Sequence, residues 1–140
     1  MPVRAKQLIF EADATWEGLV SWGEDAPVLQ TGPGATPEHL IMGAVARCTL
    51  ASLRHSAGRA GIEAGGTAHA HGVVSARPED GVFAFVEVAV DLDVTMSPDP
   101  GPEGLRDLIA RAERGCFAGQ SLRAKPLYRW RVNGAEVLAA

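Results

Sequence analysis

The chain has 140 residues, 46% of them hydrophobic and 21% charged, which is the composition of an ordinary globular protein. Its net charge of −4 and its lack of a basic run argue against nucleic-acid binding, because tracking phosphates requires clustered Lys and Arg. No apolar run approaches the roughly 20 residues of a membrane span, and the N-terminal residues lack the apolar centre of a signal peptide. We therefore expect one domain over residues 1–140, located in the cytoplasm, with neither nucleic acid nor membrane as a partner.

The first 35 residues predict short strands. Residues 6–15 and 16–22 carry β-favouring side chains and are interpreted as a hairpin or meander, with a possible third strand over residues 28–30. The clusters GEDAP (23–27) and TGPGA (31–35) indicate a turn and a loop. Trp16 and Trp22 are interpreted as core or interface residues, since burial is the usual use of large aromatic side chains.

A long helix is predicted over residues 36–61. Thr36 is a suitable N-cap, Pro37 occupies the first helical position, and Glu38 falls in the first turn, where a carboxylate is favoured. Cys48 lies near the middle of this helix and is expected to point inward with an apolar stripe. The stripe recurs at three- and four-residue spacing and comprises Leu40, Ile41, Ala44, Val45, Cys48, Ala51 and Ser52. A helix this long and apolar needs more cover than one small subunit offers, which predicts a homodimer.

A strand hairpin is expected after the helix. Residues 67–77 and 82–95 form the predicted strands and Pro78–Gly81 the turn between them. One face of the second strand is apolar, as expected for antiparallel strands on a helix; it comprises Val82, Val86, Val88, Val90, Leu92 and Val94. His69 and His71 have a spacing that allows metal binding, but no neighbouring acid or cysteine completes a site, so a solvated face is favoured and no metal is predicted.

The last third predicts a second helix and a final strand. The helix spans residues 102–114, with Leu105, Leu108, Ile109 and Ala112 on its buried side. Gly115 ends it and Cys116 follows at once. Residues 127–132 alternate as a strand, closed by the turn pair Asn133–Gly134 and a short tail.

The two cysteines, Cys48 and Cys116, lie 68 positions apart and outside any C-x-x-C motif. Each alone is more commonly a buried structural residue than a reactive one. In a reducing compartment such a pair is either two inert thiols or a redox couple.

The order of these features resembles the OsmC/Ohr family, the osmotically inducible protein C and organic hydroperoxide resistance proteins. The segment TPEHLIMGAVARCTLASL is similar to the family's helix with its first cysteine, and CFAGQSL is similar to its second cysteine segment. The resemblance implies an α+β fold in which antiparallel sheets pack on a long central helix in an intertwined homodimer. It also implies thiol-dependent reduction of organic hydroperoxides, without a cofactor, by means of a thiol or lipoyl-type dithiol reductant.

The resemblance further assigns roles to three residues. Cys48 would be the peroxidatic thiol, Cys116 the resolving thiol, and Glu38 the carboxylate that holds an activating arginine. The sequence departs from the family in two places: residues 11–35 contain no Arg or Lys, and Phe117 replaces the usual Pro after the second cysteine. Arg4, Arg47 or an arginine of a partner chain are the candidate replacements. The alternative function is a non-catalytic OsmC-like small-molecule-binding protein with inert cysteines.

Overall fold

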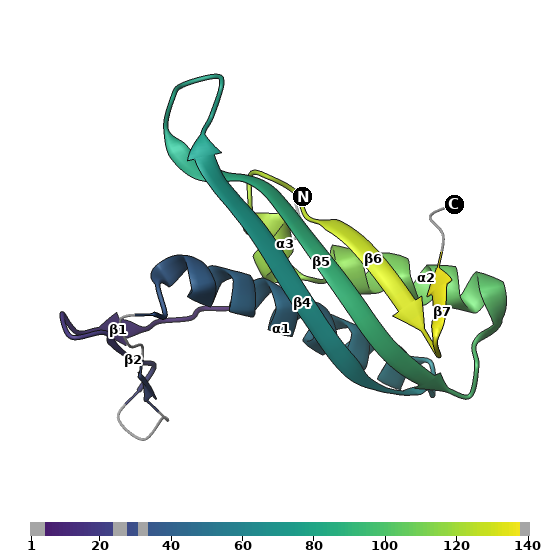
Figure 1. The fold of residues 1–140 in the computed structure, drawn as a ribbon. Helices are drawn as coiled ribbons and strands as arrows, with labels where there is room; N and C mark the ends of the chain where they lie inside the picture. Colours follow the sequence, from purple (N-terminus) through teal and green to yellow (C-terminus); the bar gives the residue numbers. More distant parts are fainter. Residues whose placement is uncertain (1–4, 24–27, 31–33, 138–140) are drawn as a thin grey trace. The chain divides into compact units, whose positions relative to one another are not determined.

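The computed structural model describes residues 5–23, 28–30 and 34–137. The chain separates into two compact units, Met1–His39 and Leu40–Ala140. The described residues form ten elements, seven strands and three helices, shown in Figure 1. The expected α+β class is therefore confirmed. No helix in the described ranges combines the length and the apolar character needed to cross a membrane.

The first unit contains three very short strands. β1 (Asp13–Ala14), β2 (Leu19–Ser21) and β3 (Leu29–Gln30) pair antiparallel in that order. The predicted meander is present, but only small parts of the predicted strands are paired. Large apolar side chains of this unit are exposed, so it offers little packing to hold longer strands. They comprise Leu8, Ile9, Phe10, Trp16, Leu19, Trp22, Val28 and Leu29.

Trp16 and Trp22 belong to this exposed set, with Trp16 fully exposed. Neither is a core residue of the chain itself, and their interpretation as interface residues stays a prediction. The turn predicted over residues 23–27 and the loop over 31–35 lie largely outside the described residues.

Helix α1 (Pro37–Arg59) confirms the long helix predicted from the sequence. Its first turn is held by a reciprocal pair of hydrogen bonds between two residues. The His39 N–H donates to the Thr36 hydroxyl at 3.4 Å, and the Thr36 N–H donates to Nδ1 of His39 at 3.2 Å. Thr36 is thus the predicted N-cap. His39 accepts the reciprocal hydrogen bond from the N–H of the N-cap residue, as the side chain of Glu or Gln does in a capping box.

The buried face of α1 differs from the predicted stripe. Ile41, Ala44 and Ala51 are exposed. The buried side chains are Val45, Thr49, Leu53, Ser56 and Ala57. Small residues lie on several faces of this helix, so their spacing does not single out one face. The helix consequently keeps a second, partly apolar face in the open.

The second unit is built on a four-stranded sheet in the order β4-β5-β6-β7. Its strands are β4 (Glu63–Ala76), β5 (Phe83–Ser97), β6 (Leu127–Val132) and β7 (Ala135–Val137). The predicted β4–β5 hairpin is antiparallel, as expected. β6 runs parallel to β5, a pairing the antiparallel expectation did not include, because the intervening helices return the chain in the same direction. The predicted tail after Asn133–Gly134 is strand β7, antiparallel to β6.

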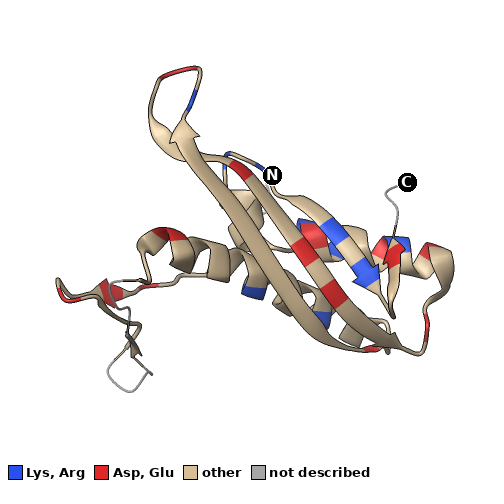
Figure 2. Ribbon diagram, in the orientation of Figure 1, with Lys and Arg blue, Asp and Glu red and all other residues tan. Residues whose placement is uncertain are grey.

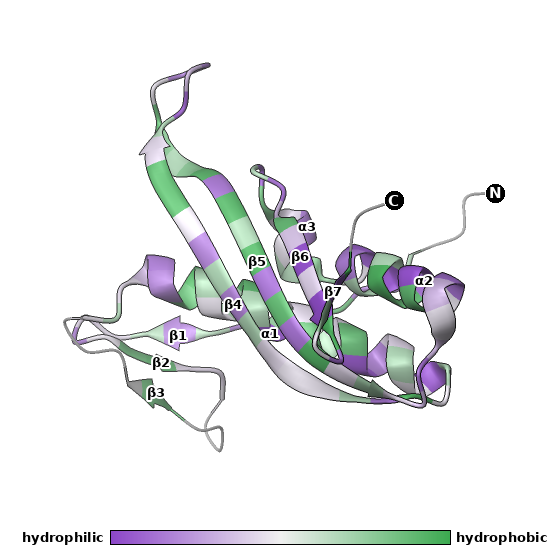
Figure 3. Cartoon of the chain, turned by 45° about the vertical axis from the view of Figure 1, so that its right-hand side comes forward, coloured by the Kyte–Doolittle hydropathy of each residue, from purple (hydrophilic) through white to green (hydrophobic). Residues whose placement is uncertain are grey.

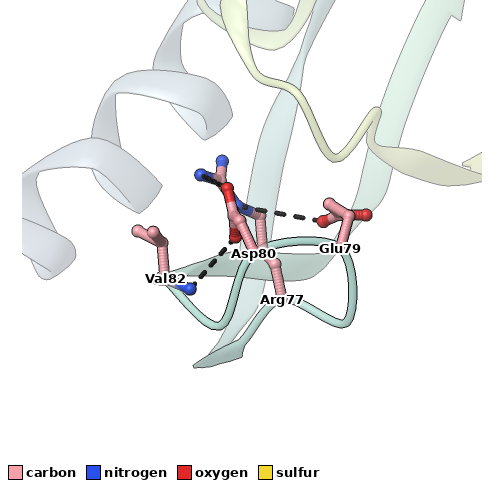
Figure 4. Close-up of polar contacts among 4 residues, drawn as sticks. All are labelled: Arg77, Glu79, Asp80 and Val82. Carbon is pink, nitrogen blue, oxygen red and sulfur yellow. Dashed lines mark hydrogen bonds and ion pairs between the residues drawn. The ribbon is translucent and has the colours of Figure 1, made fainter.

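The turn of the β4–β5 hairpin is organised by one carboxylate (Figure 4). Asp80 accepts hydrogen bonds from Nη2 of Arg77 at 2.7 Å, from Nε of Arg77 at 3.1 Å and from the Val82 N–H at 3.0 Å. Gly81 has φ of 71°, a conformation that glycine adopts without strain. The turn predicted over residues 78–81 is therefore confirmed.

Helices α2 (Gly101–Arg114) and α3 (Phe117–Ser121) connect β5 to β6. In Figures 1 and 3, α1 and α2 lie on the same face of this sheet. The core between them buries Val45, Leu53, Val90, Leu92, Val94, Met96, Leu108, Ala112, Trp130 and Val132. The predicted apolar face of β5 is confirmed from Val88 to Val94. Val82 and Val86 are exposed, and a bulge between Val73 and Val74 shifts the register there.

Charged residues alternate with the buried apolar residues along β5 and β6 (Figure 2), so they lie on the face of the sheet away from the core. Asp91 on β5 accepts a hydrogen bond from Nε of Arg129 on β6 at 2.8 Å, and Asp93 stands opposite Arg131. His69 and His71 are exposed, and His69 stands opposite Asp91, whose pKa is lowered mainly by the hydrogen bond from Arg129. The two histidines therefore lie on a solvated, charged strand face.

Candidate active site

The two cysteines are brought together by the end of α2. Gly115 ends this helix and lies so close to α1 that a Cβ atom added there would be 2.5 Å from the Ser52 hydroxyl oxygen. The next residue, Cys116, is consequently directed at α1, where its thiol interacts with that of Cys48. Both thiols are free. The structure therefore places two reduced cysteines, distant in sequence, in side-chain contact.

The two thiols differ in their access to solvent. Cys48 is half-buried, whereas Cys116 has no exposed surface. The expected inward direction of Cys48 is thus only partly realised: its sulfur lies against Cys116 at the edge of the core. Of the two thiols, Cys48 is therefore the one open to a reagent that arrives from solvent.

Cys116 is surrounded by polar groups although it is fully buried. Its sulfur is 3.4 Å from the Thr49 hydroxyl oxygen and accepts from the Gly119 N–H at 3.4 Å. The carbonyl of Val45 lies 3.8 Å from the same sulfur and accepts from the Thr49 hydroxyl at 2.9 Å. The phenol of Tyr128 on β6 also interacts with Cys116 and Thr49. The sulfur is therefore held by a ring of neutral hydrogen-bonding groups.

Opposing influences act on the Cys48 thiol. Burial, as the largest cause, raises its pKa, because desolvation disfavours the thiolate, and the neighbouring Cys116 raises it further. The backbone N–H groups of Ala118 and Phe117 act in the other direction by donating to the sulfur. None of these main causes is a cationic side chain. The resting thiol is consequently protonated unless a charge from elsewhere favours the thiolate.

A groove of about 650 Å³ opens beside Cys48. Its lining comes from α1, from the end of α2 and from the start of α3: Cys48, Ala51, Ser52, His55, Ser56, Arg111, Arg114, Gly115 and Phe117. Arg111 forms an ion pair with Asp107 at 3.2 Å. Arg114 has no ion pair among the described residues. The groove thus combines apolar surface, a thiol and two guanidinium groups.

The remaining predicted site residues are Glu38, Arg4 and Arg47. Glu38 is exposed in the first turn of α1, in the first unit, where its own backbone N–H and the Thr36 hydroxyl lower its pKa. Arg4 lies outside the described residues. Arg47 lines a separate cavity of about 240 Å³ with Arg54 and Gly65, not the groove of Cys48. Within the second unit, the structure brings the candidate residues Cys48 and Cys116 together.

Sequence reasoning missed Thr49, Tyr128 and the two groove arginines. Arg111 and Arg114 carry no site role in the sequence prediction, and no helix is predicted over residues 117–121, where the structure has α3. Tyr128 alternates within β6 like any strand residue, so no local signal distinguishes it. Among the described residues there is no group of three or more His, Cys, Asp and Glu able to hold a metal ion.

Comparison with known families and structures identifies the fold. Residues 30–130 match the family model described as OsmC-like protein. No curated protein matches the chain.

Solved structures match over almost their full length. An OsmC-like protein of unknown function from Vibrio cholerae is 14% identical with a TM-score of 0.75, covering 89% of this chain and 100% of that one. An OsmC-like protein from Mycoplasma pneumoniae is 16% identical with a TM-score of 0.70, covering 92% and 99%. An organic hydroperoxide resistance protein from Elizabethkingia anophelis is 21% identical with a TM-score of 0.62, covering 92% and 98%. At these identities the likeness concerns the fold.

Proposed function

The chain belongs to the OsmC-like protein family, and on that premise we propose that it is a thiol-dependent peroxidase that reduces organic hydroperoxides. The observation that carries this proposal is the contact between Cys48, half-buried beside a groove, and the fully buried Cys116. Some solved structures of this fold are described as organic hydroperoxide resistance proteins, which agrees with this chemistry.

In the proposed reaction the Cys48 thiolate attacks one peroxide oxygen. The O–O bond breaks, the alkoxide leaves and takes up a proton as an alcohol, and Cys48 becomes a sulfenic acid. The Cys116 thiol then attacks the Cys48 sulfur, forming an S–S bond while the S–O bond breaks and water leaves. Two thiol groups of a reductant, a small thiol or a lipoyl-type dithiol, return the pair to its reduced state. No cofactor takes part.

The groove gives a physical reason for preferring organic substrates. Ala51 and the side chain of Phe117, which is 60% exposed, offer apolar surface next to Cys48. Burying an alkyl tail there contributes about 0.8 kcal/mol per methylene. Hydrogen peroxide has no such group, so its reaction gains nothing from the groove.

Activation of Cys48 needs a positive charge, because burial raises its pKa. We propose Arg114 and Arg111 as the first candidates within the described residues, since both line the groove with Cys48. Arg4 and an arginine from a partner chain remain alternatives. The role predicted for Glu38, holding the activating arginine, stays a proposal that depends on which arginine acts.

We further propose that the protein is a homodimer located in the cytoplasm. The first unit leaves large apolar side chains in water, among them Ile9, Phe10 and Trp16, and exposed apolar side chains that lie together commonly mark an interface. The exposed face of α1, with Ile41 and Ala44, adds to it. A second copy of the chain is the proposed cover for these surfaces.

Two observations favour a second candidate function. The raised pKa of Cys48, combined with a stretch over residues 11–35 that has no Arg or Lys, favours a binding protein with inert cysteines. In that case the groove would hold a small molecule and the thiols would remain reduced.

Peroxide consumption separates these two functions. With a dithiol reductant, the wild-type protein is expected to consume cumene hydroperoxide faster than hydrogen peroxide, and Cys48→Ser to consume neither. Cys116→Ser is expected to complete one turnover and then to over-oxidise at Cys48, because the sulfenic acid has lost its partner. If the wild-type protein consumes no hydroperoxide, or Cys48→Ser consumes it equally fast, the peroxidase proposal fails.

A further inference from the structure

The polar groups around Cys116 have no role in the proposed peroxide step, which takes place at Cys48. The sulfur of Cys116 has no exposed surface and is nevertheless within 3.4 Å of both the Thr49 hydroxyl oxygen and the Gly119 nitrogen. A buried thiol needs few hydrogen bonds, because it is a small and weakly polar group. A buried thiolate needs several, because burial of an unpaired charge is costly.

Gly119 permits the approach of a further donor. A Cβ atom added at this position would be 2.7 Å from the Tyr128 hydroxyl oxygen and 3.3 Å from the Cys116 sulfur. The absence of a side chain at Gly119 therefore lets the phenol and the sulfur share one small space. Burial raises the pKa of Tyr128, so the phenol keeps its proton at neutral pH and can donate it in a hydrogen bond.

The donors fit the thiolate better than the thiol. In the thiol state the Cys116 S–H can point to the Val45 carbonyl at 3.8 Å, and Thr49 donates to the same carbonyl at 2.9 Å. When Cys116 loses its proton, the Gly119 N–H, the Tyr128 O–H and the Thr49 O–H can all be directed at the sulfur. Hydrogen bonds to an ionised acceptor are about twice as strong as those between neutral groups.

We propose that Tyr128, assisted by Thr49 and the Gly119 N–H, stabilises Cys116 as the leaving thiolate when the Cys48–Cys116 disulfide is reduced, so that the reductant attacks Cys48. This inference rests on the disulfide of the proposed function and names a positioning residue, Tyr128, for its reduction. The difference in solvent exposure between the two cysteines also supports attack of the reductant on Cys48, since Cys48 lines the groove and Cys116 is fully buried.

The reduction then proceeds in two balanced steps. A reductant thiolate forms an S–S bond with Cys48 while the Cys48–Cys116 bond breaks and Cys116 leaves with the electron pair. The second reductant thiol loses its proton to the Cys116 thiolate or to solvent and attacks the reductant sulfur of the mixed disulfide. Cys48 is released as a thiolate, and the reductant leaves as its own disulfide.

The first test identifies which cysteine carries the mixed disulfide. The protein is oxidised with diamide, so that the disulfide forms without any peroxide, and is then treated with 2-mercaptoethanol, quenched in acid and mapped by mass spectrometry. The expected product has 2-mercaptoethanol on Cys48 and a free thiol on Cys116. A mixed disulfide mainly on Cys116 would overturn the inference.

The second test measures the role of the phenol. Tyr128→Phe keeps the ring and removes the donor, so reduction of the diamide-formed disulfide is expected to slow about tenfold, the loss of one hydrogen bond to a charged group. Thr49→Ser, which keeps a hydroxyl, should retain most of the wild-type rate, and Thr49→Val should lower it. Arg129→Gln is the matched control, because Arg129 is the next residue on β6 and pairs with Asp91 on the opposite face of the sheet.

Two readouts separate this role from a merely structural one. Alkylation of Cys48 in the reduced protein, and the thermal midpoint, are expected to be the same in Tyr128→Phe and the wild type. Equal reduction rates of the two proteins would refute the inference. Because diamide forms the disulfide, the reduction rates can be measured even if the protein consumes no hydroperoxide. In that case only the proposed function fails.

Discussion

The contact between Gly115 and Ser52 predicts that Gly115→Ala slows formation of the Cys48–Cys116 disulfide. The residue has φ of −82°, which alanine adopts freely, so the substitution tests packing and not backbone strain. The new Cβ would stand 2.5 Å from the Ser52 hydroxyl oxygen and 3.1 Å from the Arg111 carbonyl oxygen, where ordinary contact begins at 3.4 Å. The end of α2 must therefore move from α1 by up to about 0.9 Å, or the Ser52 side chain must rotate away.

This displacement acts directly on the neighbouring Cys116. A misplacement of about 1 Å between reacting groups can cost about a hundredfold in rate, and overpacking of this kind costs about 1–3 kcal/mol of stability. We expect disulfide formation after stoichiometric diamide to slow by about ten- to a hundredfold. The rate is measured by quenching samples with a reagent that alkylates free thiols and determining the mass of the intact protein by mass spectrometry.

Two further variants test whether the contact between Gly115 and Ser52 causes the effect. Ser52→Ala combined with Gly115→Ala removes the closest atom and leaves the Cβ of residue 52 at 3.7 Å, so most of the rate should return. Gly58→Ala is the matched control, since nothing lies within 4 Å of its added Cβ. A wild-type rate in Gly115→Ala, or no recovery in the double variant, would show that this contact does not position Cys116.

Three other predictions concern stability and assembly. Leu53→Ala should lower the free energy of unfolding by about 3 kcal/mol, measured by denaturant titration, because Leu53 is only 2% exposed in the core; a loss under 1 kcal/mol would contradict this packing. The Arg129 guanidinium lowers the pKa of Asp91, so the stabilisation by this pair is present above about pH 4, the ordinary pKa of Asp, and is lost as the pH falls through the folded-state pKa. Asp91→Asn should therefore flatten the thermal midpoint's decline below pH 4, and an unchanged pH profile would count against it. Phe10→Ser with Trp16→Ser should weaken the proposed dimer in analytical ultracentrifugation, whereas a wild-type protein that sediments as a folded monomer at micromolar concentration would remove the dimer altogether.

The sequence predicted those elements whose signals are local and strong. The helix capped by Thr36, the hairpin turning at Asp80–Gly81 and the strand over residues 127–132 all follow from capping, turn chemistry and periodicity. The short strand β7 was missed although Asn133–Gly134 is a strong hairpin signal, because only three residues follow it in the ladder.

The arrangement of the site was only partly predictable. The order of the two cysteine segments indicated Cys48 and Cys116, but apart from the nearby Gly119 the polar neighbours of Cys116 come from α1 and β6 and meet only through tertiary packing. The buried face of α1 was misjudged because Thr49 and Ser56 are polar and yet buried, while Ile41 is apolar and exposed. Hydrophobic spacing cannot identify a buried Thr whose hydroxyl is satisfied by the Val45 carbonyl.

The close packing of the end of α2 against α1 at Gly115 also bears on the stability of the folded protein. A bond between Cys48 and Cys116 would cross-link two elements that lie 68 positions apart in the chain. In the chain-entropy model, closing a loop of this length restricts the unfolded chain enough to favour the folded state by about 4 kcal/mol. Oxidation would then raise resistance to thermal unfolding and to proteolysis, and the reduced form would be the one that a cell's proteases remove first.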